Sequence, residues 1–419
     1  MRIGFFSEVP TFNRCLPNGV SAFIEAVSRE LALHLGHEVH IFEQTQYFGQ
    51  KKERKIADNL IIHRLFSLPL SKYQGLRIPL PFKSVFFGVD MKFDIIHAHG
   101  PMNGILATIL GRMQNCTKVI TYHTPGEQYV EYIPKMIMPV GGSYFIQWAE
   151  KLVYNSFDLM LTPAEKWRQN LIARGYKANR IFVLPNCVNI AENQMRINDQ
   201  RIQSLREKYK LNGKKVVIYV GRMSPEKCIP DIIKLVPKIV KEEPDTHFLL
   251  VGKGPYLDKY RNLAQKIAPQ NITFTGFISD EDLSNVMQMS NLGILFADGA
   301  QVFDITLLNY WSNHLPAIAR KAGGMSDVIS HNKNGILFQT NSEAYSYIIS
   351  LLQDDKLAKK LGHAGYETVK SKYSVEAVTQ QLLGYYSLAA RKFHRNDESI
   401  LSFIYRYMKF WNKKPYNLQ

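Results

Sequence analysis

The sequence predicts an α/β protein with two Rossmann-like, doubly wound domains, and three observations support this prediction. Short apolar runs alternate with amphipathic segments of helical spacing in two separate halves of the chain. The apolar runs are continuous, which is typical of parallel strands covered by helices on both faces. A polar stretch at 186–214 without a strand pattern separates the halves. Ligands of such sheets bind outside the carboxyl ends of the strands, so we expect both domains to face a cleft with those ends.

The first domain is predicted to cover residues 1–190. It opens with a β-prone run at 2–8. A segment of helical spacing follows at 19–36 and ends on Gly36, which suits the left-handed position after a helix. Further strand-like and helix-like segments alternate at 37–43, 60–66, 93–100, 103–113, 117–124, 143–157, 158–164 and 180–185. This order predicts a parallel sheet with crossover helices.

The second domain is predicted at 215–375, after a linker at 191–214 that carries a short helix. Its alternating segments lie at 214–221, 231–241, 246–254, 256–268, 271–277, 281–290, 292–297, 315–320, 327–331 and 335–339. Residues 376–419 are expected to form C-terminal helices and a basic, aromatic tail that packs back on the first domain. The last 29 residues hold seven basic and two acidic side chains. Such a tail can also lie on an anionic membrane surface, and both interpretations stay open.

The composition favours a folded protein of the cytoplasm. Hydrophobic residues make up 46% of the chain and charged residues 21%, which is enough for packed cores. Four widely spaced cysteines form no C-x-x-C pair, so neither a zinc site nor a disulfide framework is indicated. The first residues lack the apolar core of a signal peptide, and no apolar run reaches the ~18 residues that span a bilayer. We expect a cytoplasmic protein, either soluble or peripheral at the inner face of the membrane.

The net charge of +16 is spread over both halves of the chain. A diffuse basic surface favours anionic partners such as lipid head groups, phosphorylated ligands or nucleic acid, and it also serves solubility alone. No RNP-like aromatic stretch or other nucleic-acid motif accompanies the charge. We therefore expect no nucleic-acid partner, and we keep an anionic membrane surface as a candidate.

The loop after the first strand of the second domain carries the clearest chemistry. The strand ends at Gly221, Arg222 and Lys227 follow on the loop, and a helix then begins. Two cations beside a helix N-terminus can hold a diphosphate and can stabilise the charge that grows on a leaving diphosphate. The alternative is a solvated charge pair in which Glu226 binds one of the cations.

Three further turns are weaker signals when each is taken alone. Gly19 lies between a strand and a helix, where a small residue lets backbone N–H groups face an anion. Gly252 begins a Gly-x-Gly-Pro turn after a strand, and Phe277 and Ile278 follow another strand. Exposed backbone at such turns can hydrogen-bond the edge of a nucleotide base.

Two motifs are candidates for metal ligation, and both have a more ordinary explanation. His97, His99 and His123 lie at the predicted ends of neighbouring strands, but no carboxylate or cysteine shares their motifs. The acidic run 280–282 begins a predicted helix after Ser279, where acids complement the helix dipole. We expect no metal and no cofactor.

The order of these motifs resembles that of the family 4 retaining glycosyltransferases, which have the GT-B fold. The resemblance runs from about residue 1 to 375 and rests on segments such as "DIIHAHGP", "ITYHT", "YVGRMSPEKC", "LLVGKGPY" and "ITFTGFISDEDL". The segment "YHTPGEQYVEYIP" is most similar to members that glycosylate lipids. Family members need no metal, because the basic pair takes the role of a bound cation.

The resemblance implies a role for each matching position. Catalytic roles fall to His123, Arg222, Lys227 and Gln301. Contacts to the donor fall to Gly19, Arg222, Lys227, Gly252, Phe277, Ile278, Phe303 and Asn309, and contacts to the acceptor fall to Tyr129 and Tyr132. The expected reaction moves a hexose from a nucleotide sugar, a UDP- or GDP-sugar, to a lipid or glycan acceptor with retention of the anomeric configuration.

The window "QVFDITLLN", from Gln301 to Asn309, departs from the family pattern. The family has glutamates at both ends, beside the donor sugar and the nucleotide ribose. Val302 and Asp304 replace glycines that open backbone N–H groups toward phosphate, and a carboxylate at Asp304 would repel a diphosphate unless it turns away. Asp298, shifted by a three-residue insertion, is a candidate for the first acidic role. The alternative function is an inactive glycosyltransferase-like subunit that acts as a binding or scaffold partner in a glycosylation pathway.

Overall fold

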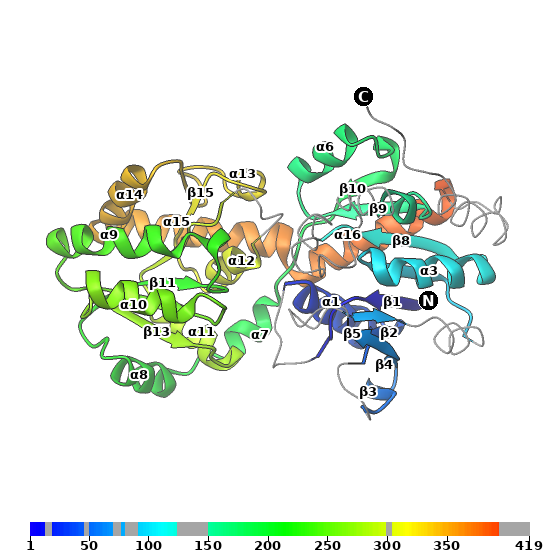
Figure 1. Ribbon diagram of the computed structural model, residues 1–419, viewed down its shortest axis with the longest axis horizontal. Coiled ribbons are helices and arrows are strands. Elements are labelled where there is room, and N and C mark those ends of the chain that lie inside the picture. Colours follow the sequence, from blue (N-terminus) through cyan, green and yellow to red (C-terminus); the bar gives the residue numbers. More distant parts are fainter. Residues whose placement is uncertain are drawn as a thin grey trace. The chain divides into compact units, whose positions relative to one another are not determined.

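The computed structural model describes residues 1–12, 19–45, 50–69, 77–79, 91–123, 150–298 and 304–393. The chain folds into two compact units (Figure 1). The first holds residues up to 163, residues 168–184 and the chain from 379 onward, and the second holds residues 164–167 and 185–378. Each unit is built around a sheet of parallel strands with helices packed on it, so the predicted pair of Rossmann-like domains is confirmed.

The first unit contains an eight-stranded sheet in the order β10-β9-β8-β7-β1-β2-β4-β3. Its strands are β1 Arg2–Ser7, β2 Glu38–Gln44, β3 Glu53–Ala57, β4 Leu60–Leu65, β7 Ile95–His99, β8 Thr117–Thr121, β9 Leu159–Thr162 and β10 Ile181–Val183. A separate hairpin pairs β5 Ser67–Pro69 with β6 Arg77–Pro79. The helices are α1 Gly19–Arg29 continued by η1 Glu30–His34, α3 Pro101–Gln114, α6 Glu165–Ala173, η2 Ala178–Arg180, α16 Val375–Leu388 and η5 Ala389–Phe393.

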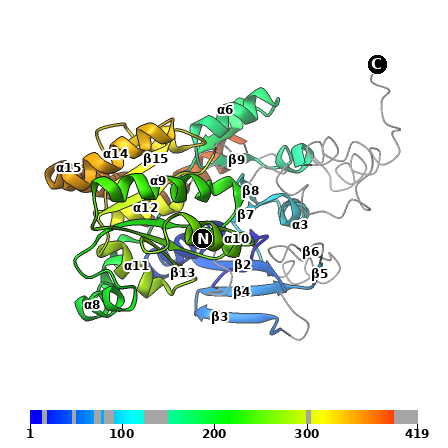
Figure 2. The same ribbon diagram turned by 60° about the vertical axis from the view of Figure 1, so that its left-hand side comes forward.

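One edge of this sheet differs from the expected all-parallel arrangement. Strand β3 pairs antiparallel to β4 and is the outermost strand, as Figure 2 shows. Its first three residues, Glu53, Arg54 and Lys55, are exposed and charged. Charged side chains on an edge strand prevent pairing with another chain. The central strands β7 and β8 are buried along their whole length, as continuous apolar strands of a two-sided sheet should be.

The second unit contains a six-stranded, fully parallel sheet in the order β13-β12-β11-β14-β15-β16. Its strands are β11 Lys215–Val220, β12 Thr246–Val251, β13 Ile272–Gly276, β14 Leu292–Leu295, β15 Ala317–Arg320 and β16 Ile336–Phe338. Its helices are α7 Ile190–Met195, α8 Asp199–Lys208, η3 Pro225–Lys227, α9 Ile229–Glu242, α10 Leu257–Ile267, α11 Asp280–Gln288, α12 Ile305–Ser312, α13 Met325–Val328, α14 Asn341–Gln353, α15 Asp355–Thr368 and η4 Val369–Tyr373.

Two apolar clusters pack on this sheet. Val217 and Tyr219 of β11 belong to one cluster, while Val216 and Ile218 belong to the other. Because successive side chains of a strand point to opposite faces, the two clusters lie on the two faces of the sheet. Helices therefore cover both faces, and the polar groups that remain open to a ligand gather at the ends of the strands.

The expected linker at 191–214 is instead folded onto the second unit. Asn198 caps α8 by accepting a hydrogen bond from the Arg201 N–H at 2.9 Å. The Arg201 guanidinium pairs with Asp282 of α11 at 2.7 Å, and Leu205 of α8 is fully buried. The stretch looks polar because Leu205 is the one buried side chain of α8. Its contacts nevertheless make it part of the packed unit.

Candidate functional site

The loop that follows β11 positions the first of the two predicted diphosphate-binding cations. Arg222 donates to Glu226 at 2.7 Å, and the Ser224 hydroxyl donates to the same carboxylate oxygen at 2.6 Å. Burial opposes ionisation of Glu226, but the hydrogen bonds from Ser224 and Arg222 outweigh it and lower the pKa of this carboxyl. The structure thus contains the Arg222–Glu226 pair that the sequence offered as the alternative to a diphosphate site.

The second cation, Lys227, forms a buried ion pair with Asp304. Lys227 Nζ lies 3.0 Å from an Asp304 carboxylate oxygen, and only 10% and 8% of the two side chains are exposed. The other Asp304 oxygen accepts from the Thr306 N–H at 3.0 Å and caps α12. Burial favours protonation of Asp304, but the Lys227 charge and these hydrogen bonds outweigh it and lower the pKa of Asp304. The carboxylate therefore turns toward Lys227 and is charged.

Asn309, at the far end of the window, is held by a second amide. Its side-chain oxygen accepts from the Asn193 amide of α7 at 3.2 Å, and its backbone carbonyl accepts from Asn313 at 2.8 Å. Asn309 is half-buried, so one side of it stays accessible. A neutral amide in this position can both donate to and accept from a hydroxyl group, but it lacks the stronger charge-assisted bond of a carboxylate.

Three loops of the second unit meet at the carboxyl edge of its sheet. Gly252 follows β12 and donates its N–H to the carbonyl of Gly276 at 2.9 Å. Gly252 has a φ of 134°, and a Cβ there would lie 1.9 Å from the Gly221 carbonyl oxygen, so only glycine fits. Phe277 is exposed and Ile278 is half-buried after β13. At this edge the Gly252 turn therefore lies between the end of β11 and the predicted base-binding turn after β13.

The acidic run 280–282 forms the first turn of helix α11. Ser279 is the N-cap of α11 and accepts from the Asp282 N–H at 3.1 Å. Asp282 is engaged with Arg201, and all three acids lie in the first turn of α11. This is the capping arrangement that we expected. In the described part of the chain, no group of three or more His, Cys, Asp or Glu side chains is placed to hold a metal ion.

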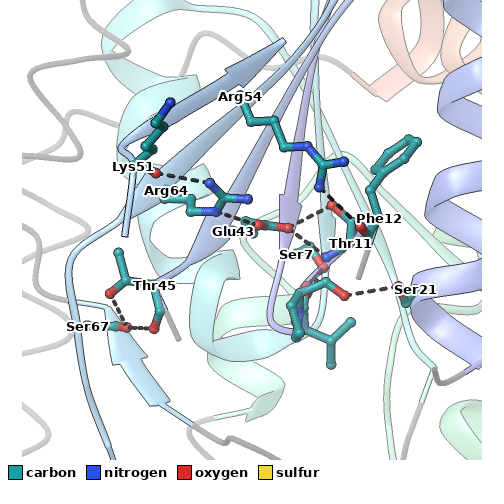
Figure 3. Close-up of polar contacts among 12 residues, drawn as sticks. Ser7, Thr11, Phe12, Ser21, Glu43, Thr45, Lys51, Arg54, Arg64 and Ser67 are labelled. Atoms are coloured by element: carbon teal, nitrogen blue, oxygen red, sulfur yellow. Dashed lines mark hydrogen bonds and ion pairs between the residues drawn. The ribbon is translucent and has the colours of Figure 1, made fainter. Parts of the chain in front are cut away.

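In the first unit, the loop after β1 is anchored by a buried carboxylate (Figure 3). Glu43 at the end of β2 accepts from the backbone N–H of Thr11 at 2.6 Å and from its hydroxyl at 2.7 Å, and Arg64 donates to it at 3.1 Å. On the helix side, the Ser21 hydroxyl donates to the Pro10 carbonyl at 3.0 Å. Gly19 begins α1, and no described residue lies within 4 Å of the place that a Cβ on Gly19 would take. The contact between Ser21 and Pro10 therefore ties the start of α1 to the loop after β1.

Three histidines gather at the carboxyl edge of the first sheet. His99 ends β7, and its Nδ1 lies 2.9 Å from Nε2 of His123, which follows β8. His97 bridges the Tyr386 hydroxyl of α16 at 2.8 Å and the Thr121 hydroxyl at 2.7 Å. Loss of hydration lowers the pKa of all three imidazoles, that of His123 to about 3. His123 is consequently neutral at pH 7 and can offer a sugar hydroxyl a hydrogen bond but no charge.

The sequence analysis missed a buried carboxylate at the same edge. Glu8 follows β1 and accepts from the Met102 N–H at the start of α3, while Gly100, with a φ of 122°, lies against its carboxyl group. Burial raises the pKa of Glu8 to about 8, even though the bond from Met102 opposes this shift. The only signal in the sequence is an acid placed directly after a strand.

Several predicted site residues fall outside the described part of the chain. They are Tyr129, Tyr132, Gln301 and Phe303, together with Val302 and the basic aromatic tail from 394 onward. Asp298 is described, and its N–H donates to the Glu226 carbonyl at 3.0 Å. The structure thus places Arg222, Lys227 and Asp304 at one loop and sets Asp298 against the same loop.

Comparison with protein families shows the family of this chain. Residues 17–192 match the model of glycosyltransferase family 4, and residues 201–368 match that of the group 1 glycosyl transferases. The chain belongs to glycosyltransferase family 4. It is a glycosyltransferase of the hexosyltransferase class, as the resemblance implied. The comparisons give no support to the inactive alternative.

Curated relatives of this family 4 glycosyltransferase include two enzymes named alpha-monoglucosyldiacylglycerol synthase. The one from Acholeplasma laidlawii is 24% identical over 371 residues, which is 85% of this chain and 89% of the relative. The one from Streptococcus pneumoniae is 26% identical over 360 residues, or 84% of this chain and 78% of the relative.

Solved structures show the same GT-B architecture. HepE of Anabaena in complex with UDP and glucose has a TM-score of 0.72 at 17% identity, covering 93% of this chain and 100% of that one. Sucrose-phosphate synthase of Thermosynechococcus elongatus has a TM-score of 0.71 at 18% identity, covering 92% and 98%. At such identities the likeness establishes the fold. No helix in the described residues is both long enough and apolar enough to cross a membrane.

Proposed function

We propose that this enzyme transfers a hexose from UDP-sugar to the hydroxyl group of a diacylglycerol-type lipid, with retention of the anomeric configuration. Two relatives that align with most of the chain carry the name of a glucosyldiacylglycerol synthase, and a third is a sulfoquinovosyl transferase of Arabidopsis thaliana. Solved neighbours were crystallised with UDP and UDP-glucose, which favours UDP over GDP.

The loop from Gly221 to Lys227 is the observation that carries the donor proposal. It brings two cations to the carboxyl end of β11, immediately before α9. In this role, Arg222 and Lys227 hold the diphosphate and stabilise the negative charge that develops as it leaves. The positive end of the α9 dipole adds to this stabilisation. No metal ion is needed in this scheme, because the two side chains supply the positive charge.

The remaining contacts follow from the edges of the two sheets. Gly252, Phe277 and Ile278 offer backbone groups to the base, and Asn309 offers its free face to the ribose. The family resemblance gives Gly19 a role beside the donor phosphates, and it gives Gln301 and Phe303 contacts with the donor. In the first unit, neutral His123 hydrogen-bonds the donor sugar, and Tyr129 and Tyr132 contact the acceptor.

Membrane association belongs to the same proposal. The net charge of +16 suits a surface that carries anionic lipids, where the lipid acceptor is found. We infer a cytoplasmic enzyme that binds peripherally to the inner face of the membrane. Flotation with vesicles tests this directly: the enzyme should float with vesicles that contain anionic lipid and remain at the bottom with neutral ones.

A transfer assay tests the proposed reaction. The purified full-length enzyme is incubated with UDP-glucose, UDP-galactose or GDP-mannose and with vesicles containing diacylglycerol, and the product is analysed by NMR. We expect an α-linked glycolipid from a UDP-sugar, and loss of product in Arg222→Ala. Absence of transfer and of hydrolysis with every donor, in folded protein that also binds no nucleotide, would favour the inactive scaffold subunit instead.

A further inference from the structure

Asp304 makes the two contacts that the diphosphate of a donor would need. One carboxylate oxygen binds Lys227 Nζ at 3.0 Å, and the other accepts from the Thr306 N–H at the start of α12 at 3.0 Å. A phosphate oxygen is held in proteins by the same kinds of partner, a cation and the N–H groups of a helix N-terminus.

We propose that Asp304 is a built-in counter-ion that occupies the diphosphate subsite, so that the donor must displace its carboxylate from Lys227 in order to bind. This inference rests on the proposed function of Lys227. It makes Asp304 a residue that sets the affinity of the enzyme for its donor, and it explains how a carboxylate can stand in a phosphate site.

The charges around the subsite support this assignment. Arg222 is paired with Glu226 at 2.7 Å and Lys227 with Asp304 at 3.0 Å, so the four side chains carry no net charge. An approaching diphosphate meets a neutral set of groups instead of two available cations. The two ion pairs differ in burial: the Arg222 side chain is 38% exposed, whereas the Lys227 side chain is 10% exposed. Only the Lys227 pair is shielded from water, so it is the one whose exchange governs binding.

The pair also has a role when no donor is bound. A lone ammonium group that is nine-tenths buried would be strongly unfavourable, because it would lack both water and a partner. Asp304 supplies the partner in the empty enzyme, and a phosphate supplies it in the complex. Lys227 is thus neutralised in both states, and donor binding becomes an exchange of one anion for another.

The test compares UDP affinity in Asp304→Asn and in wild type by calorimetry. Asparagine is also a good N-cap, so the variant keeps the start of α12 and removes only the charge. We expect Asp304→Asn to bind UDP about tenfold more tightly, because UDP no longer competes with a carboxylate. Asp304→Ser, another capping residue, provides a second variant with the same expectation should the first fold poorly.

Glu243→Gln is the matched control. Glu243 pairs with Lys215 at 2.9 Å, at the first residue of β11 and hence at the opposite edge of the sheet. This control also removes one ion-paired carboxylate, and we expect it to leave UDP affinity unchanged. An equal gain in Glu243→Gln would show that overall charge is responsible and would overturn the proposal.

The remaining outcomes separate this inference from the proposed function. If wild type binds UDP, Arg222→Ala loses the binding and Asp304→Asn binds no more tightly than wild type, the counter-ion role is wrong and the donor site stands. If neither wild type nor the Asp304 variants bind UDP or GDP, both proposals are wrong.

Discussion

The two units bury polar groups at the same kind of sheet edge in opposite ways. In the first unit three imidazoles and one carboxyl are neutral: the pKa of His97, His99 and His123 lies below its usual range, and that of Glu8 is raised to about 8. In the second unit the compared groups are charged and paired, Arg222 with Glu226 and Lys227 with Asp304. Desolvation has the larger effect on the pKa of His123 and Glu8, whereas the Lys227 charge and hydrogen bonds together have the larger effect on the pKa of Asp304.

This difference suits what each edge has to bind. A sugar or lipid hydroxyl is best held by neutral hydrogen-bonding groups, while a diphosphate needs fixed positive charge. Under the proposed function, the hydroxyl-binding role of His123 therefore belongs to the first unit and the diphosphate-binding role of Arg222 and Lys227 to the second, and the predictions below test this difference.

The largest effect is expected from leaving one member of the buried ion pair alone. Lys227→Met should lower the free energy of unfolding by about 3–5 kcal/mol, because Asp304 would remain buried without its counter-charge. The double variant Lys227→Met, Asp304→Asn should recover most of this loss. Urea denaturation of the three proteins measures both effects. A single variant as stable as wild type would mean that the pair is open to water and does not differ from a surface pair.

In the first unit, Glu8 should make stability fall as pH rises. Its pKa is about 8 in the folded protein against 4.5 as the ordinary value, so the folded state holds one more proton than the unfolded state between these values. Between pH 5 and pH 7 this costs wild type on the order of 2 kcal/mol relative to Glu8→Gln, which cannot ionise. Melting curves of both proteins over this range should diverge. Parallel curves would show that Glu8 is ionised and that the first edge also holds charge.

Placing carboxylates at positions 301 and 309 should strengthen binding and use of the donor. The double variant Gln301→Glu, Asn309→Glu should bind and use the donor about tenfold better, since a carboxylate gives the ribose a charge-assisted bond worth about 1–2 kcal/mol more than an amide. Donor hydrolysis and transfer rates measure this. No change would shift attention to Asp304 and Asp298 as the residues that limit donor use.

The smallest effect concerns which nitrogen of each neutral histidine carries the proton. His99 Nε2 is buried and has no hydrogen-bond partner among the residues that the structure describes. An unpartnered N–H is less favourable there than an unpartnered lone pair, so His99 carries its proton on Nδ1 and donates it to His123 Nε2. His123 then carries its own proton on Nδ1. Nitrogen NMR of the imidazoles should show both histidines in this form, and in His99→Phe the preference of His123 should disappear. A spectrum with protons on Nε2 would reverse the assignment.

The sequence predicted those features that depend on interactions between residues close together in the chain. The strand, loop and helix around Arg222 follow from a short stretch, and the Arg222–Glu226 pair is set by a spacing of four residues. The edge glycines are equally visible, because Gly252 permits a backbone approach that a side chain would block. The fold class therefore could be predicted, but the antiparallel edge strand β3 and the packing of residues 191–214 on the second unit could not.

The parts of the site that could not be predicted depend on distant contacts. Lys227 and Asp304 are separated by 77 residues, and Asn193 and Asn309 by 116. Asn193 also belongs to the stretch that was expected to be a linker with one short helix, whereas the structure has two helices there, α7 and α8. The burial of Glu8 arises from α3, whose Met102 lies 94 residues further along the chain. Local spacing carries no information about such pairings.

A crystal structure of the full-length enzyme with UDP tests the central claim most directly. We predict that the β-phosphate contacts both the Arg222 guanidinium and Lys227 Nζ, and that the Asp304 carboxylate is turned away from Lys227. A structure in which UDP is bound while the Lys227–Asp304 pair remains intact, and in which the phosphates lie away from both cations, would contradict it.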